Sequence, residues 1–219
     1  GPVMIGPSSS HTAGAARTGY TAQKLLGEVP ARADIGLYGS FATTGRGHGT
    51  DRALVAGLLG MRPDDPRLPD SFAAAEQAGM EFHIHPVELR SAHPNTAVLQ
   101  LEGRSGRKLA LTAASVGGGR IRVTEIDGVP ADFGGDSNTL IIHNEDTPGC
   151  IAEVTVSLAL RRINIASMQV FRAAPGTYAV MVLECDSHIP PALEKQLALV
   201  PGIRKVTCLN VDEPQEPGV

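Results

Sequence analysis

The chain has 219 residues, of which 42% are hydrophobic and 19% charged, and its formal net charge is −4. This composition is that of a globular protein, and a negative charge without a basic cluster argues against a nucleic-acid partner. No apolar run reaches the roughly 18 residues of a membrane-spanning helix, so we expect no membrane partner either. The opening stretch lacks the features of a signal peptide. Three cysteines lie far apart, which is typical of free thiols in a reducing compartment, and we expect a cytoplasmic protein.

The first part of the chain, up to about Asp136, is rich in glycine and alanine and predicts an α/β (α+β) domain. Helices are expected over residues 10–26, 51–59 and 69–78, and strands over residues 34–41, 81–89, 96–101, 108–116 and 121–126. Gly117–Gly119 would form the turn of a hairpin. Residues 132–137, with their paired glycines and short polar side chains, are predicted to be a linker.

The second part alternates apolar strands with amphipathic helices. Strands are expected over residues 140–143, 166–172, 178–184 and 203–209. One helix would begin at Thr147-Pro148, with Thr147 as N-cap, and end near Arg161; another would cover residues 191–199. The order β-α-β-β-α-β is that of the ferredoxin-like unit. We therefore expect two domains, residues 1–136 and 137–219.

The first segment suited to chemistry is the run Gly-Pro-Ser-Ser-Ser-His-Thr, residues 6–12. Hydroxyls and free backbone N–H groups at a helix start can hold an anion, and three serines precede His11 and Thr12 here. A serine N-cap beside a surface histidine is the alternative interpretation. His11 favours the functional one, because a histidine in such a site can exchange protons near neutral pH.

The second segment, Thr-Thr-Gly-Arg-Gly-His-Gly-Thr-Asp at residues 43–51, follows a predicted strand and precedes a helix. Its alternating glycines, among them Gly45 and Gly47, let the backbone approach a ligand closely. His48 lies between two glycines, and Asp51 could orient its ring. A phosphate loop is the alternative, but the Lys-Ser/Thr of the Walker pattern is missing.

Together these runs resemble the β portion of bacterial iron–sulfur L-serine dehydratases. The segment His93-Pro94-Asn95-Thr96 and the Gly117–Gly119 turn also fall where that family would place them, so the resemblance spans essentially the whole first domain. The family's enzyme removes the β-hydroxyl of L-serine, and the released aminoacrylate becomes pyruvate and ammonia. An iron of a 4Fe–4S cluster acts on that hydroxyl as a Lewis acid, and the cluster's cysteines belong to the α portion.

For this chain the resemblance implies a carbon–oxygen lyase subunit that needs an α chain as partner. It implies His11 and His48 near the reacting atoms, with substrate-binding roles for Ser8, Ser9, Ser10, Thr12, Gly45, Gly47 and Asp51. No cysteines have C-x-x-C spacing, so we expect the cluster on the partner α chain and none on this chain alone. A monovalent cation and the identity of the group that abstracts the α-proton are left open.

His83 and His85 form a separate pattern. Two histidines at i, i+2 on a strand share a face and could bind a metal ion. The sequence offers no third ligand, so a solvated strand face is favoured and no metal site is predicted.

The segment Asn144–Gly149 resembles the Asp-x-Pro-Gly loop of ACT domains, and Ile163-Asn164-Ile165 resembles the segment after their first helix. In that family the loop holds a free amino acid between paired domains. The resemblance implies a homodimer through the ACT domains, L-serine as both substrate and effector, and effector contacts from Asn144, Asp146, Gly149, Asn164 and Ile165. An ordinary start of a helix is the alternative interpretation of the loop. The alternative function for the whole chain is a non-catalytic, amino-acid-sensing regulatory subunit.

Overall fold

The computed structural model describes residues 11–45 and 49–211, which divide into two compact units. The first unit contains the chain up to Gly128 together with residues 132–134, and the second contains residues 129–131 and the chain from Gly135 onward. No helix in the described ranges is long and apolar enough to cross a membrane.

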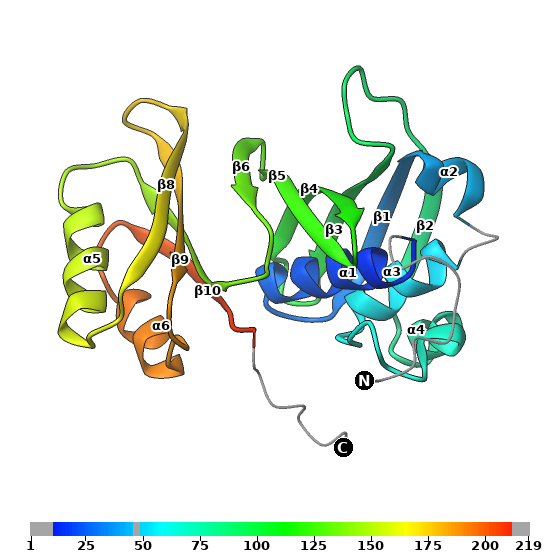
Figure 1. The fold of residues 1–219 in the computed structure, drawn as a ribbon, viewed down its shortest axis with the longest axis horizontal. Coiled ribbons are helices and arrows are strands. Elements are labelled where there is room, and N and C mark those ends of the chain that lie inside the picture. Colours follow the sequence, from blue (N-terminus) through cyan, green and yellow to red (C-terminus); the bar gives the residue numbers. More distant parts are fainter. Residues whose placement is uncertain (1–10, 46–48, 212–219) are drawn as a thin grey trace. The chain divides into compact units, whose positions relative to one another are not determined.

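The first unit contains most of a six-stranded sheet in the order β2-β1-β3-β4-β5-β6 (Figure 1), whose edge strand β6 is shared between the two units. Its strands are β1 (Pro30–Gly39), β2 (Glu81–Pro86), β3 (Asn95–Gly103), β4 (Lys108–Gly117), β5 (Arg120–Ile126) and β6 (Val129–Phe133). The edge strand β2 runs parallel to β1, whereas the pairs β1–β3, β3–β4 and β4–β5 are antiparallel. Among the described strands, β2 pairs with β1 alone.

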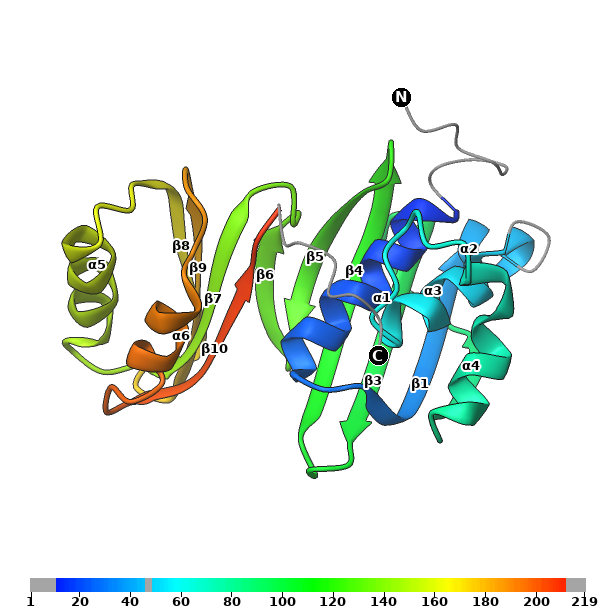
Figure 2. The same ribbon diagram turned by 90° about the horizontal axis from the view of Figure 1, so that it is seen from below.

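The helices of this unit are α1 (Ala13–Leu26), α2 (Ser40–Thr44), α3 (Thr50–Leu58) and α4 (Ser71–Gln77), with a 3-10 turn at Leu68–Asp70. Figures 1 and 2 show α1 and α3 side by side on one face of the sheet. Glycine makes this close packing possible. A Cβ at Gly19 would overlap the carbonyl oxygen of Leu54, one at Gly57 would overlap that of Ala16, and one at Gly14 would overlap Ser115. The glycine-rich composition of the first domain thus serves packing as well as loops.

The second unit has the predicted ferredoxin-like order, which the structure confirms. It contains β7 (Asn138–Glu145), α5 (Cys150–Leu160), β8 (Ile165–Ala174), β9 (Tyr178–Cys185), α6 (Pro191–Leu197) and β10 (Ile203–Leu209). The four strands form an antiparallel sheet in the order β10-β7-β9-β8. Its core joins one face of the sheet to both helices through Leu140, Ile142, Val154, Leu158, Leu183, Leu193 and Leu197.

Three local predictions were wrong. The predicted linker begins inside β6, where Val129, Ala131 and Phe133 are buried at every second position. The predicted strand over 34–41 ends at Gly39, whose φ of 61° turns the chain into α2. Thr147 is not an N-cap, because α5 begins at Cys150 after Gly149, and the Thr147 hydroxyl lies 3.5 Å from Cys150 Sγ.

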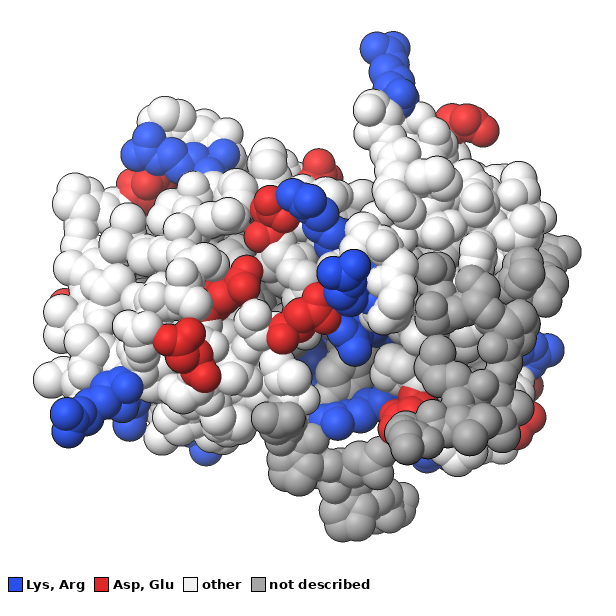
Figure 3. Space-filling view, in the orientation of Figure 1, with Lys and Arg blue, Asp and Glu red and all other residues white. Residues whose placement is uncertain are grey.

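The surface of one face mixes both signs of charge. Figure 3 shows lysine and arginine side chains interspersed with aspartate and glutamate side chains, and neither sign forms a continuous patch there.

Candidate functional site

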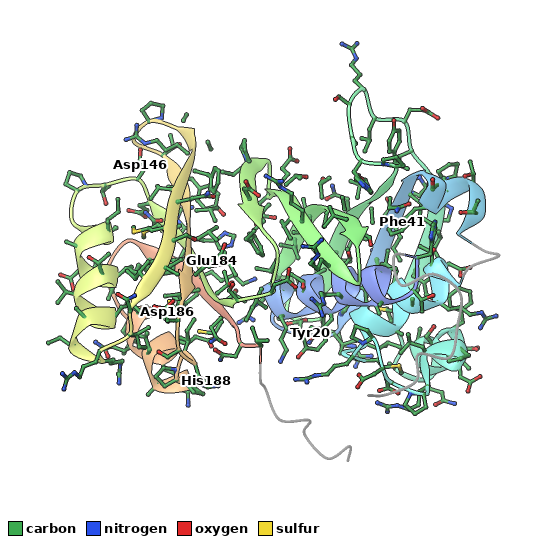
Figure 4. The ribbon with its side chains drawn as sticks, viewed as in Figure 1. Tyr20, Phe41, Asp146, Glu184, Asp186 and His188 are labelled. Carbon is green, nitrogen blue, oxygen red and sulfur yellow. The ribbon has the colours of Figure 1, made fainter. Side chains whose placement is uncertain are left out.

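The structure places His11 against the second motif, 33 residues further along the chain. Its Nε2 lies 3.3 Å from the Oγ1 of Thr44, at the end of α2. The imidazole also packs on Phe41, with ring centroids 5.7 Å apart and planes tilted by 57° (Phe41 is labelled in Figure 4). Two segments that the sequence analysis treated separately therefore meet at one place in the fold.

The hydrogen bonds of Thr44 favour one tautomer of a neutral His11. Thr44 Oγ1 donates its single hydrogen to the carbonyl oxygen of Ser40 at 2.7 Å. Toward His11 the hydroxyl then accepts, and His11 Nε2 would carry the N–H. In that tautomer the lone pair of the ring lies on Nδ1.

The glycine-rich segment is closed at its base by a hydrogen bond from the Thr50 N–H to the Gly45 carbonyl oxygen, at 2.8 Å. A Cβ at Gly45 would overlap the Phe41 carbonyl oxygen, and Gly49 adopts a φ of 71°, so both positions require glycine. Asp51 lies in the first turn of α3, where its carboxylate accepts the N–H of Arg52 at 2.8 Å. That carboxylate therefore faces its own helix start, and its contact with His48 stays a prediction.

Of the remaining residues predicted to bind substrate or transfer protons, one lies within the described part of the chain and the others do not. Thr12 immediately precedes α1, and its carbonyl oxygen accepts the N–H of Ala16 at 2.9 Å. Ser8, Ser9, Ser10, Gly47 and His48 lie outside the described residues.

A third segment, His93–Thr96, borders the same place. Gly39 pairs with Asn95, and a Cβ at Gly39 would lie 2.5 Å from the Pro94 carbonyl oxygen. That oxygen accepts the N–H of Phe41 at 3.4 Å, which ties the segment to α2. Asn95 Oδ1 is buried and accepts no hydrogen bond from the described part of the chain. Asn95 is thus a candidate polar contact that the sequence named only as part of a motif.

The Gly117–Gly119 turn reaches this end of the sheet as well. A Cβ at Gly119 would lie 3.3 Å from the Cβ of Ala13, the first residue of α1. The start of β3, the end of β4 and the start of α1 therefore lie beside the end of β1 and α2. Each of the four segments noted in the sequence begins or ends at one of these elements.

The cysteines do not fit an iron–sulfur cluster. Cys150 and Cys185 are each 4% exposed in the core of the second unit, and all three thiols are free. Burial, together with the nearby charge of Asp186, raises the pKa of Cys185 to about 11. Cluster ligands are thiolates gathered around one centre, and these buried thiols of separate elements offer no such arrangement.

In the second unit, the predicted effector loop contains one unsatisfied acceptor. Asn144 is 3% exposed; its Nδ2 donates to the Glu145 carbonyl oxygen at 2.7 Å, and its Oδ1 accepts nothing from the described residues. Asp146, by contrast, accepts the N–H of Gly176 at 2.8 Å and pairs with Arg172 at 3.0 Å. These contacts hold the pKa of Asp146 below its usual range. Gly149 has a φ of 100° and open space where a Cβ would be.

The five predicted effector residues do not meet within one copy of the unit. Asn164 donates to Asp186 Oδ2 at 2.6 Å, and Ile165 pairs with Cys185, which lies opposite Asn138. Asn144 lies six residues further along β7, about 20 Å away at the usual rise per residue. Figure 4 shows the Asp146 and Asp186 labels at opposite ends of this sheet.

Two further polar groups were missed by the sequence analysis. His143 is 4% exposed, and its Nδ1 contacts the Tyr178 hydroxyl. Burial, together with the nearby charge of Lys205, lowers the pKa of His143 to about 4. Asp34 lies beside His83 and His85 because β1 and β2 are neighbours. His143 could have been noticed in the sequence, because it stands among the apolar residues of β7. The contact of Asp34 with the two histidines could not, because no sequence signal reveals the pairing of β1 with β2.

Comparisons with known proteins agree with the division of the chain into two units. Residues 2–80 match the sequence model of the serine dehydratase beta chain, and residues 138–199 match that of the ACT domain. The chain is 41% identical over 207 residues to the probable L-serine dehydratase, beta chain, of Bacillus subtilis (strain 168), covering 94% of both. It is 33% identical over 208 residues to the L-serine dehydratase, beta chain, of Peptoniphilus asaccharolyticus, covering 94% of this chain and 92% of the relative.

Among solved structures, the ACT domain from GTP pyrophosphokinase of Chlorobium tepidum matches 33% of this chain and 95% of its own, with 22% identity and a TM-score of 0.27. The family assignment rests on the sequence relatives, which align along nearly their whole length. This chain belongs to the serine dehydratase beta chain family and carries an ACT domain in its second unit.

Proposed function

We propose that this chain is the β chain of an iron–sulfur L-serine dehydratase, which converts L-serine to pyruvate and ammonia together with a cluster-bearing α chain. Two relatives that align along nearly their whole length are named L-serine dehydratase beta chains, which supports the assignment of this reaction. The observation that supports the proposal for this chain is the contact between His11 and Thr44, because it brings one residue of the serine-rich segment beside one residue of the glycine-rich segment. We place the enzyme in the cytoplasm, which suits its three free thiols.

In the overall reaction, serine loses its α-proton and its β-hydroxyl, and the resulting aminoacrylate tautomerises to an imine that water hydrolyses to pyruvate and ammonia. This chain would contribute binding and proton transfer. Ser8–Ser10 and Thr12 would donate hydrogen bonds to the serine carboxylate at the start of α1. His11, with Nδ1 as its proton-accepting atom, and His48 would move protons near the reacting carbons. The alternative, a subunit that only senses amino acids, needs no titrating pair of this kind.

The cluster would belong to the α chain. No step is assigned to the cysteines of this chain, because Cys150 and Cys185 lie buried and Cys208 partly buried in the packing of the ACT domain, on separate elements.

Reconstitution tests the function directly. The chain is mixed anaerobically with a candidate cysteine-bearing α chain, and pyruvate formation from L-serine is followed. We expect turnover only when both chains are present. Full turnover by the α chain alone would make this chain a regulator and would favour the alternative function.

We further propose that two ACT domains pair through β8 and bind L-serine as effector. Strand β8 is a sheet edge of ten residues, and Val170 on it is 39% exposed. Edge strands with unpaired backbone groups favour such pairing. Antiparallel pairing of two β8 strands would place the start of one beside the end of the other. The Asn164 end of one copy would then lie near the Asp146 end of its partner, which is how five separated residues could form one site.

The loop offers complementary groups to an amino acid. Asn144 Oδ1 is an unused acceptor for the ammonium, and the free N–H groups at the start of α5 can receive the carboxylate. Because Asp146 is already paired with Arg172, we assign it the role of holding the loop against the β8–β9 hairpin.

Calorimetric titration of the full chain with L-serine tests this site. Gly149→Leu is expected to abolish the heat of binding. Gly60→Leu is the matched control, since Gly60 also has a positive φ, 85°, and open space at its Cβ position. Sedimentation tests the interface: Val170→Glu should yield monomers, whereas Leu199→Glu, at a position that is 85% exposed outside β8, should not. A wild-type monomer that gives no heat with serine would refute the effector proposal.

A further inference from the structure

Asp34, His83 and His85 form a cluster on the exposed face of the first sheet. Asp34 lies on β1 and pairs in register with His83 on β2, while His85 lies two residues further along on the same face. Asp34 Oδ1 is 3.5 Å from His83 Nδ1, and Asp34 Oδ2 is 2.8 Å from His85 Nε2. The two imidazoles stack with centroids 5.1 Å apart and planes inclined by 22°. Backbone pairing therefore holds three potential metal-ligand groups together without any contribution from a loop.

The spacing of these groups suits a small divalent ion. One ligand atom from each residue lies within 4.8 Å of the other two. Zinc binds histidine nitrogen and carboxylate oxygen at about 2.0–2.2 Å, so two ligands of a tetrahedral site are about 3.3–3.5 Å apart. The two separations from Asp34, 2.8 Å to His85 and 3.5 Å to His83, lie on either side of about 3.4 Å. Rotation of the exposed side chains can bring the two histidine nitrogens to the same separation. Two histidines and one carboxylate are also a ligand set that zinc uses when its fourth position is open.

The surroundings of His85 are compatible with a metal ligand. Its Nδ1 lies 3.2 Å from the Pro86 carbonyl oxygen, while its Nε2 lies 2.8 Å from the carboxylate of Asp34. A doubly protonated imidazole satisfies both oxygens in the absence of metal. A metal ion would replace the Nε2 proton, with a small separation of Nε2 and Asp34, while Nδ1 keeps donating to Pro86. A histidine ligand whose second nitrogen donates to a backbone carbonyl is the usual geometry of metal sites.

Access and charge allow an ion to enter. The side chains of Asp34, His83 and His85 are 49%, 76% and 32% exposed. The nearest cationic side chain in the paired register, Arg32, lies opposite Glu81 with their charged atoms 4.0 Å apart. A fourth ligand could be water or a group from a partner.

We propose that Asp34, His83 and His85 bind one divalent ion of the zinc class, which fastens the edge strand β2 to β1. The ion would add a link across the two strands that does not depend on backbone hydrogen bonds. This site is separate from the one formed by His11 and Thr44 and does not depend on the proposed dehydratase function.

The test uses the full chain, freed of metal by a chelator and carrying no histidine tag. Cobalt(II) is titrated as a spectroscopic substitute for zinc, followed by zinc in competition. We expect one equivalent to bind, with visible bands of cobalt and without the intense sulfur-to-cobalt absorption that a cysteine ligand would produce. His85→Gln, His83→Gln and Asp34→Asn should each weaken binding by at least about tenfold. His188→Gln, which removes an exposed histidine of the second unit, should bind as the wild type does.

A second measurement needs no variant. Zinc should shift the imidazole NMR signals of His83 and His85, leave those of His93 and His188 in place, and raise the thermal unfolding midpoint of the chain. The proposal is overturned if the wild type binds no stoichiometric metal at micromolar concentration. It is equally overturned if all three variants bind as tightly as the wild type, or if the shifted signals belong to other histidines.

Discussion

Acid should destabilise the second unit through His143. This residue is 4% exposed on β7, and burial lowers the pKa of its ring to about 4 in the folded protein. In the unfolded chain the pKa returns to about 6.5. Between these values the unfolded state binds a proton that the folded state does not. The contribution of neutral His143 to the free energy of unfolding is therefore fully present above pH 6.5 and is lost as the pH falls toward 4.

The size of this effect follows from the two pKa values. Protonation of this histidine in the unfolded state lowers the free energy of unfolding by about 2–3 kcal/mol at pH 4.5 and by about 1–1.5 kcal/mol at pH 5.5. His143→Gln keeps a polar side chain beside Tyr178 but removes the titrating group. We therefore expect the variant to lose less stability between pH 7 and pH 4.5 than the wild type, by roughly that amount, whatever its stability at pH 7.

Urea unfolding followed by circular dichroism at a series of pH values measures the difference. Other acidic groups titrate equally in both proteins, so the comparison of slopes isolates His143. NMR titration of its ring should give a midpoint near pH 4, with the His143→Gln spectrum identifying the signal. Parallel slopes in the two proteins, or a midpoint near 6.5, would refute the argument that burial governs this histidine.

Three further predictions concern catalysis, the cluster and helix packing. In the reconstituted enzyme, His11→Ala and His48→Ala should each lower kcat by about 10²–10⁴-fold, whereas His188→Ala should leave pyruvate formation unchanged; normal turnover in both would exclude a proton-transfer role. The chain purified alone without oxygen should be colourless and iron-free, and a stable visible charge-transfer band would contradict the cluster assignment. Gly57→Val should lower the free energy of unfolding by at least about 1–3 kcal/mol in urea titration, because its Cβ would overlap the Ala16 carbonyl oxygen; unchanged stability would contradict the close helix crossing.

The second unit could be predicted from sequence because its signals are local. Apolar residues at helical spacing, short polar turns and the strand order β-α-β-β-α-β all lie within short stretches of chain, and the structure confirms that order. The start of α5 was misplaced because a Thr-Pro pair is a usual helix-start signal, whereas the N-cap in the structure is Gly149, two residues later.

The candidate sites could be predicted only in part, because their geometry depends on pairing between distant segments. The motifs named His11 and the glycine-rich segment, but only the fold of α2 against the start of α1 brings Thr44 to His11. Asp34 could not be assigned to His83 and His85, since the parallel pairing of β1 with β2 joins residues about fifty positions apart. Conversely, the ACT resemblance grouped Asn144 with Asn164, which strand register places at opposite ends of one sheet.

A double-mutant cycle between His11 and Thr44 tests most directly whether the two motifs form one catalytic site. Pyruvate formation is measured in the enzyme reconstituted with wild type, His11→Ala, Thr44→Val and the double variant, at saturating L-serine. If Thr44 acts by orienting the imidazole, the second substitution costs little once the first is present. The combined loss in kcat should then be smaller than the product of the single losses by at least about twofold, the coupling typical of residues in contact. Single losses that multiply without coupling, or no loss in either variant, would contradict the account.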